Sequence, residues 1–312
     1  MKTTLAAVLA VSVFIMGCGP QDAIVDDVYD DEAEAGQELI DGLRGRPLGL
    51  DVAQWNVMWL GNTEFGPTNE TDQNERVGAL IKSANVDLWA LTEVSNQASF
   101  DQLVARVPGY AGLAATDPRV AGGTASYSIQ EQRPALLYKT RAISVRTARL
   151  ILTDQASTFA GRPPLEAELS VTINRKTLDL TVIVVHLKAG PGLDDRARRL
   201  RASELLETHV KTLSGEVLVI GDWNDATTRS IASGQTSPFT NWSDSGLTWL
   251  TQPLEEQGQK SSIFGSFIDH AIATPGLLGK RDSTTVTDPR PTIPNYANTT
   301  SDHFPVLHLF SL

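Results

Sequence analysis

The chain has 312 residues, of which 41% are hydrophobic and 20% charged, and a formal net charge of −11. Its single cysteine, Cys18, excludes an internal disulfide and argues against a cysteine-ligated metal. Most of the negative charge lies before Pro47, so the rest of the chain is only mildly acidic, which neither demands nor excludes an anionic substrate.

The N-terminus has the pattern of an export signal. Lys2 precedes an apolar run from Leu5 to Met16, which is too short to span a bilayer and suits a signal-peptide core. The run ends in Ile15-Met16-Gly17-Cys18, which resembles the lipobox of bacterial lipoproteins, with cleavage before Cys18. We therefore expect a signal peptide over residues 1–17 and a lipid on Cys18, which would anchor the protein to a bacterial membrane surface (periplasm or cell surface). The alternative is an ordinary secretory signal, with Cys18 incidental.

The next stretch is predicted to be an acidic, disordered tether over residues 18–46. Nine acidic residues oppose two arginines there, and few apolar residues are available to offset the entropy of ordering the chain. Residues 47–312 are long enough for one large α/β domain.

Within that domain, apolar runs predict strands over 48–55, 86–94, 135–139, 145–152, 166–173, 178–187, 217–220, 268–273 and 305–310. Apolar spacing predicts helices over 74–84, 99–107 and 194–213. Residues 110–133 and 280–301 are rich in Gly, Pro, Thr and Asn and are predicted to be loops. More strands than helices, several of them apolar on both faces, indicate an α/β (α+β) fold of two packed mixed sheets with helices outside.

The segment from Val217 to Asn224 carries the clearest sign of chemistry. Four apolar residues end in Gly-Asp-Trp-Asn, which places a carboxylate and an amide at the end of a buried strand. Burying a carboxylate costs several kcal/mol unless its charge is paired or used. Alone, the segment is as consistent with an Asx-turn as with a catalytic pair.

Five further strands also have polar residues at or near their ends. Any one of them could be a cap or a satisfied buried group. Together they predict a hydrolytic site that binds a hard divalent cation at one rim of the two sheets. The set is Asn56, Glu93, His186, Asp222, Asn224, Asp269, Asp302 and His303.

The ordered motifs WNVMW, LTEVS, VVHLK, GDWND, FIDHA and SDHFPV resemble those of the endonuclease/exonuclease/phosphatase superfamily, over about residues 48–312. This family includes deoxyribonuclease I, neutral sphingomyelinases and inositol-polyphosphate phosphatases. The resemblance implies a four-layer sandwich and cleavage of phosphate esters with Mg²⁺, or with Mn²⁺ or Ca²⁺ as alternatives.

The resemblance also implies a role for each residue. By this resemblance Glu93 is the principal metal ligand, and Asn56 and Asp302 lie at the metal site. Asp222 becomes the base for the attacking water and Asn224 holds the phosphate or nucleophile. His303 contacts the phosphate, and Asp269 fixes the tautomer of His303. His186 is the second histidine, and which of the two histidines acts as the acid opposite Asp222 is left open. Arg133 is a weaker candidate for a phosphate contact.

Met58 occupies a position that is acidic or an amide in exonuclease III-like members, so one principal metal is favoured. Several other residues are predicted to be structural: His209, His270, His308 and Trp223. The arginines between 196 and 201 are predicted to form a solvated helix face, with a contact to phosphate as the alternative.

The leading functional hypothesis is a secreted, membrane-tethered nuclease that acts on extracellular DNA or RNA. A sphingomyelinase-type enzyme is the second hypothesis, with Trp242 the nearest candidate for contact with lipid. An inositol or sugar phosphatase is the third, and a catalytically silent surface-binding protein is a remote fourth. No protein partner is evident, and we expect a monomer.

Overall fold

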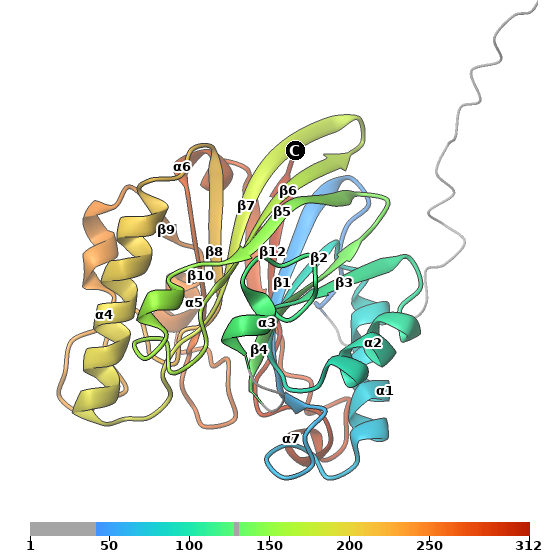
Figure 1. Cartoon of the computed structure of the whole chain (residues 1–312), viewed down its shortest axis with the longest axis horizontal. Helices are drawn as coiled ribbons and strands as arrows, with labels where there is room; N and C mark the ends of the chain where they lie inside the picture. Colours follow the sequence, from blue (N-terminus) through green and yellow to red (C-terminus); the bar gives the residue numbers. More distant parts are fainter. Residues whose placement is uncertain (1–41, 128–130) are drawn as a thin grey trace, which may run out of the picture. The chain divides into compact units, whose positions relative to one another are not determined.

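The computed structural model describes residues 42–127 and 131–312, which form two six-stranded mixed sheets with helices on their outer faces (Figure 1). The predicted signal peptide, Cys18 and most of the predicted tether lie outside the described residues. Leu43 is buried, the amide of Gly45 donates to the carbonyl of Ala84, and Arg46 pairs with Asp51 and Asp282. Packing against the domain therefore begins at Leu43, slightly before the predicted start at Pro47.

The first sheet has the strand order β11-β12-β1-β2-β4-β3. Its strands are β1 (Gly49–Leu60), β2 (Leu88–Val94), β3 (Tyr110–Ala114), β4 (Arg133–Lys139), β11 (Arg281–Val286) and β12 (Val306–Ser311). The second sheet has the order β5-β6-β7-β8-β10-β9. It contains β5 (Ile143–Leu150), β6 (Leu165–Ile173), β7 (Lys176–His186), β8 (Glu216–Asp222), β9 (Thr248–Trp249) and β10 (Asp269–Ala273).

Three long helices complete the layers: α1 (Glu70–Ala84), α2 (Gln97–Arg106) and α4 (Leu193–Val210). The remaining helices are short: α3 (Gly123–Ser126), α5 (Gln252–Glu256), α6 (Pro275–Leu278) and α7 (Tyr296–Thr299). Three apolar cores separate the layers. One fills the space between the sheets, one lies between the first sheet and α1 with α2, and one lies between the second sheet and α4. The predicted four-layer sandwich is confirmed.

Each predicted strand and helix is present, with small shifts at the ends, but three strands were missed. Residues 110–133 and 280–301 are not loops throughout, because they contain β3 and β11. In β11 every residue is exposed or only partly buried, so it lacks the apolar pattern that marks a strand in sequence. β9 has two residues, too few to show a period.

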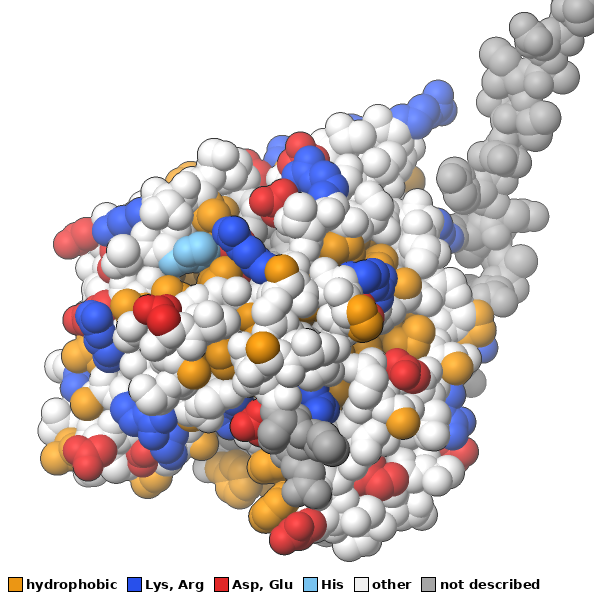
Figure 2. Space-filling model, in the orientation of Figure 1, with side chains coloured by type: hydrophobic (Ala, Val, Ile, Leu, Met, Phe, Trp, Pro, Cys, Tyr) orange, Lys and Arg blue, Asp and Glu red, His pale blue; other side chains and the backbone are white. Residues whose placement is uncertain are grey.

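No helix within residues 42–127 and 131–312 is both long and apolar enough to cross a membrane. On the face shown in Figure 2, basic and acidic side chains are interspersed, and neither sign covers a continuous area. The informative polar groups therefore lie at the sheet rim.

Alternation along the strands sends the candidate residues toward the space between the sheets. On β8, Leu218 and Ile220 belong to the inter-sheet core, and Asp222 continues that face. On β7, the same face carries Leu180, Val182, Val184 and then His186. On β1, it carries Leu50, Val52 and then Gln54 and Asn56. Each face is apolar in the middle of the strand and polar at its end.

The arginines of α4 are not a simple solvated helix face. Arg199 is completely buried, and its guanidinium donates to Asp225, directly after the Gly-Asp-Trp-Asn motif, at 2.9 Å. It also donates to the carbonyls of Lys188 and Gly190. Arg199 thus ties α4 to the loops that follow β7 and β8, and the prediction that it is solvated was wrong.

We expect Arg199→Met to lower the free energy of unfolding by about 3–5 kcal/mol, because it leaves Asp225 charged and buried without its partner. Urea unfolding measures the loss. Arg201→Met, on the same helix, removes an exposed pair with Glu204 and should cost at most about 1 kcal/mol. Equal losses of unfolding free energy in the two variants would show that the buried pair stabilises the fold no more than the exposed pair does.

Candidate active site

The predicted site residues meet at one rim of the two sheets. β1 pairs with β2 in parallel, and β7 pairs with β8 in parallel, so their carboxyl ends lie on the same side within each sheet. β10 runs antiparallel to β8 and places Asp269 opposite Asp222. The bridge between Ser262 and His303 brings the segment before β12 to the same place.

The side chain of Asn56 joins the two sheets at this rim. Its amide nitrogen donates to Glu93 of β2 at 2.9 Å and to Asp222 of β8 at 3.0 Å. Its amide oxygen accepts from the backbone N–H of Met58 at 2.9 Å. In this arrangement Asn56 faces the carboxylates with its N–H groups and positions them.

Glu93 reaches the site through an unusual backbone. Trp89 and Leu91 point to the outer core of the first sheet, and regular alternation would send Glu93 there too. Instead Glu93 has a positive φ of 63° and its carboxylate accepts from Asn56 and from the backbone N–H of Trp59 at 3.0 Å. Burial raises the pKa of Glu93, the charge of Asp302 raises it further, and the Asn56 hydrogen bond opposes both.

Four residues at this rim have left-handed backbone. Met58, Trp59, Glu93 and Asn224 all have φ between 46° and 63°. Such conformations cost side-chain-bearing residues on the order of 1 kcal/mol each and cluster at functional sites. Gly221 has φ 137°, and a Cβ there would lie 2.2 Å from the carbonyl oxygen of Val185, so only glycine lets β8 approach β7 this closely.

Asp222 is buried among other charges. Burial raises its pKa to about 7; repulsion from Asp269 and Glu93 adds to the rise, and His303 and the Asn56 hydrogen bond oppose it. One of its oxygens accepts from the backbone N–H of Asn224 at 2.9 Å. The side chain of Asn224 donates to the carbonyl of Leu187 at 3.1 Å, which connects the ends of β8 and β7.

His303 is held as an imidazolium. Its Nδ1 donates to Asp269 at 2.8 Å, which leaves Nε2 facing Asp222 at 3.9 Å and Asp302 at 4.0 Å. Burial lowers the pKa of His303, but the charges of Asp269 and Asp222 outweigh it, so the pKa is well above the usual value. The structure thus shows the contact between Asp269 and His303 that the motif resemblance implied.

His186, unlike His303, is held in its neutral form. Its Nε2 lies 3.6 Å from both Glu93 and Asp222, while its buried Nδ1 meets no hydrogen-bond partner among the described residues. Burial lowers the pKa of His186 well below the usual value, and the positive charges of Arg162 and His303 lower it further. At neutral pH, therefore, His303 carries the extra proton and His186 does not.

The donor set fits a hard divalent cation. Ligand-capable atoms of Glu93, His186 and Asp222 lie within 4.8 Å of one another, as do those of Asp222, Asp269 and His303. The first group fits better, because His303 is already protonated and bound to Asp269. Oxygen-rich groups of this kind suit Mg²⁺ or Ca²⁺, and a cation would relieve the repulsion that raises the carboxyl pKa values. Asp302 is outside both groups but close enough to Glu93 to raise its pKa.

Two arginines line the same rim. Arg133 begins β4, and its guanidinium donates to the carbonyl of Ser95, two residues after Glu93, at 2.6 Å. Arg162 was not predicted. It donates to the carbonyls of His186 and Leu187. Burial lowers the pKa of Arg162, and the charges of Glu93 and Asp222 oppose that shift. Its only sequence signal was a Gly-Arg pair before an apolar strand, which is too common to mark a site.

The residues predicted to be structural lie away from this chemistry. His209 contacts Glu166 at 2.5 Å, and His308 is fully buried beside Thr284. His270 points to the opposite face from Asp269, where it contacts Thr251. Trp223 is buried against Phe239, Trp242 and Trp249. These four assignments agree with the structure.

Comparisons with known proteins agree with this geometry. The model of the Endonuclease/Exonuclease/phosphatase family matches residues 53–303, which span every candidate active-site residue. None of the curated proteins matches the chain in sequence.

Solved structures share the fold at low sequence identity. Zebrafish (D. rerio) TDP2, crystallised with a single-strand DNA product, is 13% identical, with a TM-score of 0.61 over 85% of this chain and 99% of that one. The 3′ phosphatase NExo from Neisseria, bound to a product DNA hairpin, is 18% identical, with a TM-score of 0.61 and coverage of 84% and 100%. An AP endonuclease from Archaeoglobus fulgidus is 16% identical, with a TM-score of 0.59 and the same coverage.

We expect Asp269→Asn to lower the pKa of His303 by at least about one unit, because it removes the carboxylate that stabilises the imidazolium. The ring would then lose its proton at a lower pH than in the unaltered protein. NMR titration of the histidine rings measures this, with the His303 signal assigned from His303→Gln. Asp282→Asn, the same change at an exposed site, should leave the titration unchanged; an unchanged titration in Asp269→Asn would contradict the assignment.

Proposed function

Because the chain belongs to the endonuclease/exonuclease/phosphatase family, whose members hydrolyse phosphoester bonds with divalent metals, we propose that it is a metal-dependent nuclease. The observation that carries the proposal is the convergence of Glu93 and Asp222 from different sheets with an imidazolium, His303, beside them. A binding protein has no need to bury repelling carboxylates beside a protonated histidine, whereas hydrolysis of a phosphodiester needs a base and positive charge together.

In the proposed reaction, Asp222 accepts a proton from the water that attacks phosphorus. Its pKa of about 7 leaves it able to take a proton near neutral pH. His303 lies beside this base, so its positive charge would stabilise the negative charge on the non-bridging phosphate oxygens. His186 is uncharged, and its Nε2 lies 3.6 Å from a carboxylate oxygen of both Glu93 and Asp222, so we assign it the role of a residue that positions the metal and the two carboxylates.

The cation we propose is Mg²⁺, with Mn²⁺ or Ca²⁺ as alternatives. Glu93 and Asp222 of the first group would hold it, and Asp302, whose charge acts on Glu93, would be a further carboxylate at the metal site. When bound, it would supply the charge that neutralises the phosphate and the leaving oxygen. Met58 offers backbone groups and no ligand side chain here, in keeping with one principal metal.

Nucleic acid is the substrate class we favour. The support is the shared fold with the two proteins crystallised with DNA products, and the motif set that includes His186 in VVHLK. A sphingomyelinase-type activity is the second candidate, because Phe65 and Phe264 are 53% and 73% exposed. Trp242, the earlier candidate for contact with lipid, is buried and cannot insert into a membrane.

We expect the purified full chain to cleave single-stranded or plasmid DNA with Mg²⁺, and EDTA to abolish the cleavage. Asp222→Asn should lower the rate by about 10²–10⁴, because the base is lost while the shape is kept. The substrate panel is DNA, RNA, sphingomyelin, an inositol phosphate and bis-p-nitrophenyl phosphate. If the protein cleaves sphingomyelin but neither DNA nor RNA, the nuclease proposal is wrong and the sphingomyelinase-type activity takes its place. No cleavage of any substrate would favour a binding protein.

We also propose that the protein is exported and anchored through a lipid on Cys18. The support is the run of Lys2, the apolar segment and Gly17-Cys18, with no other cysteine in the chain. Cys18→Ser should move the protein from the membrane fraction to the soluble fraction of a bacterial host, measured by immunoblot after ultracentrifugation. Gln21→Ala, three residues further along the chain, serves as the control and should stay with the membranes. Equal partition of both variants and the unaltered protein would contradict lipidation at Cys18.

A further inference from the structure

Helix α1 has a buried glutamine on its core face. Gln73 is fully buried, and Val77, Leu80 and Ile81 follow it at helical spacing on the face of α1 that packs against the first sheet. A buried amide costs free energy unless its groups form hydrogen bonds, and the Oε1 of Gln73 meets no partner within residues 42–127 and 131–312. An apolar side chain would continue the core stripe, so packing alone does not account for the glutamine.

The amide nitrogen of Gln73 binds three backbone carbonyls. It donates to the carbonyl oxygens of Val57 at 2.8 Å, Met58 at 2.9 Å and Thr300 at 3.1 Å. Since a carbonyl oxygen can only accept, the NH2 group of the amide, and not its oxygen, must face all three. Gln73 thus connects α1 to the end of β1 and to the segment before His303.

Two of these carbonyls belong to peptide groups that also contact site residues. The peptide group before Met58 directs its C=O to Gln73 and its N–H to the Oδ1 of Asn56, at 2.9 Å. The peptide group after Met58 directs its C=O to Gln73 and its N–H to Glu93, at 3.0 Å. A trans peptide group is planar and rigid, with its C=O and N–H on opposite sides. Gln73 therefore holds one end of each group, and Asn56 or Glu93 is bound at the other end.

This arrangement depends on the left-handed backbone at the end of β1. In an extended strand, successive carbonyls point to opposite edges, so one side-chain amide could not reach two in a row. Met58 and Trp59 have φ values of 46° and 52°, and the carbonyls of Val57 and Met58 both face Gln73. The hydrogen bonds from Gln73 offset the strain of this turn.

The third carbonyl connects Gln73 to the histidine segment. Ser301, the residue after Thr300, donates its hydroxyl to the carbonyl of Asn56 at 2.6 Å. The same hydroxyl accepts from the N–H of His303 at 3.0 Å. One buried amide of α1 thus holds together the end of β1 and the segment before β12.

We propose that Gln73 is a positioning residue for the proposed hydrolysis, which orients Asn56 and Glu93 through the two peptide groups that flank Met58. The proposal rests on the proposed nuclease function. A misplacement of about 1 Å in the reacting groups can slow a reaction by about a hundredfold. Loss of the Gln73 hydrogen bonds should therefore lower kcat and leave KM nearly unchanged, because every residue at the rim is still present.

The test is Gln73→Met, which removes the N–H donors and keeps a long, unbranched side chain. The amide hydrogens of Met58 and Trp59 should exchange with deuterium at least about tenfold faster, because the carbonyl ends of their peptide groups are released. With a twelve-residue oligothymidylate and saturating Mg²⁺, kcat should fall about tenfold or more, and KM should change no more than about twofold. NMR-detected hydrogen exchange and steady-state kinetics measure the two effects.

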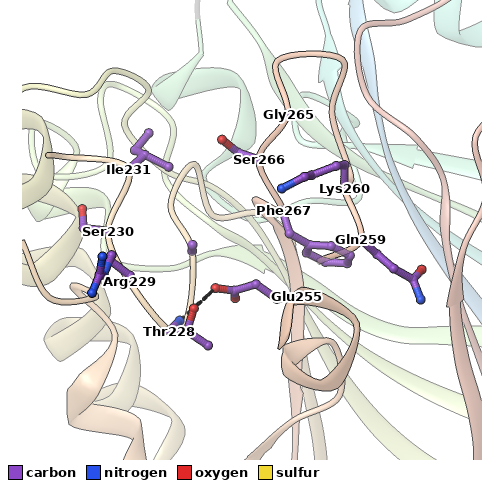
Figure 3. A pocket seen from close by; sticks show the side chains of 11 residues that line it. Thr228, Arg229, Ser230, Ile231, Glu255, Gln259, Lys260, Gly265, Ser266 and Phe267 are labelled. Atoms are coloured by element: carbon purple, nitrogen blue, oxygen red, sulfur yellow. Dashed lines mark hydrogen bonds between the residues drawn. The ribbon is translucent and has the colours of Figure 1, made fainter. Parts of the chain in front are cut away.

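Two control variants separate positioning from folding. Asn74→Leu removes a buried amide from the same helix, where it donates to Ser99 and accepts from Arg106. Gln259→Met makes the same substitution at a glutamine that lines the hollow in Figure 3 and donates to Gln257. Both controls should keep kcat within about twofold and leave the two exchange rates unchanged.

The proposal is wrong if Gln73→Met and Asn74→Leu lower kcat alike for equal losses of unfolding free energy, because Gln73 would then be only structural. It is also wrong if either kcat or the exchange rates stay unchanged in Gln73→Met, or if KM rises at unchanged kcat. In each of these cases the nuclease function stands. If Gln73→Met does not fold, Gln73→Asn, whose amide is one CH2 too short to reach all three carbonyls, takes the same measurements and criteria. If the unaltered chain cleaves no nucleic acid, the nuclease function fails and the positioning role fails with it.

Discussion

The side chain of Asn56 is the contact on which the site depends. Its amide nitrogen donates to a carboxylate of each sheet, Glu93 and Asp222, and so holds together two like charges that would otherwise repel across the sheet interface. The carbonyl of Asn56 in turn accepts from Ser301, next to Asp302 and His303, at 2.6 Å. One residue therefore sets the distance between the sheets at the rim and positions three catalytic segments around it.

The remaining groups are arranged around that constraint. The negative charges of Asp269 and Asp222 outweigh burial and raise the pKa of His303, whereas burial and the positive charges of Arg162 and His303 keep the pKa of His186 low. The site thus contains one charged and one neutral imidazole within reach of the same carboxylate. Strained backbone at Met58, Trp59 and Glu93 is tolerated because hydrogen bonds to Asn56 and Glu93 hold it in place.

Much of this could be predicted from the order of residues. Apolar runs ending in Asp222, His186 and Asp269 predicted strands whose polar ends face one another, since alternation along a strand is regular. Glu93 was found as a polar residue at the end of a predicted strand, but its left-handed backbone, and not regular alternation, brings its carboxylate to the site. Arg162 and the buried Arg199–Asp225 pair were missed, since arginines on a loop or helix resemble solvated ones in sequence. The exposed strand β11 was missed for lack of an apolar face.

The sequence by itself determined nine of the twelve strands within the described residues and the kinds of polar groups at their ends, because the apolar pattern of a strand is a local property of the chain. Only the tertiary structure decided which histidine is charged and that Asn56 turns its N–H groups toward the carboxylates of both sheets. These depend on distances between segments far apart in the chain. Electrostatic interaction between groups varies with their separation and burial, and neither quantity is encoded in any single stretch of sequence.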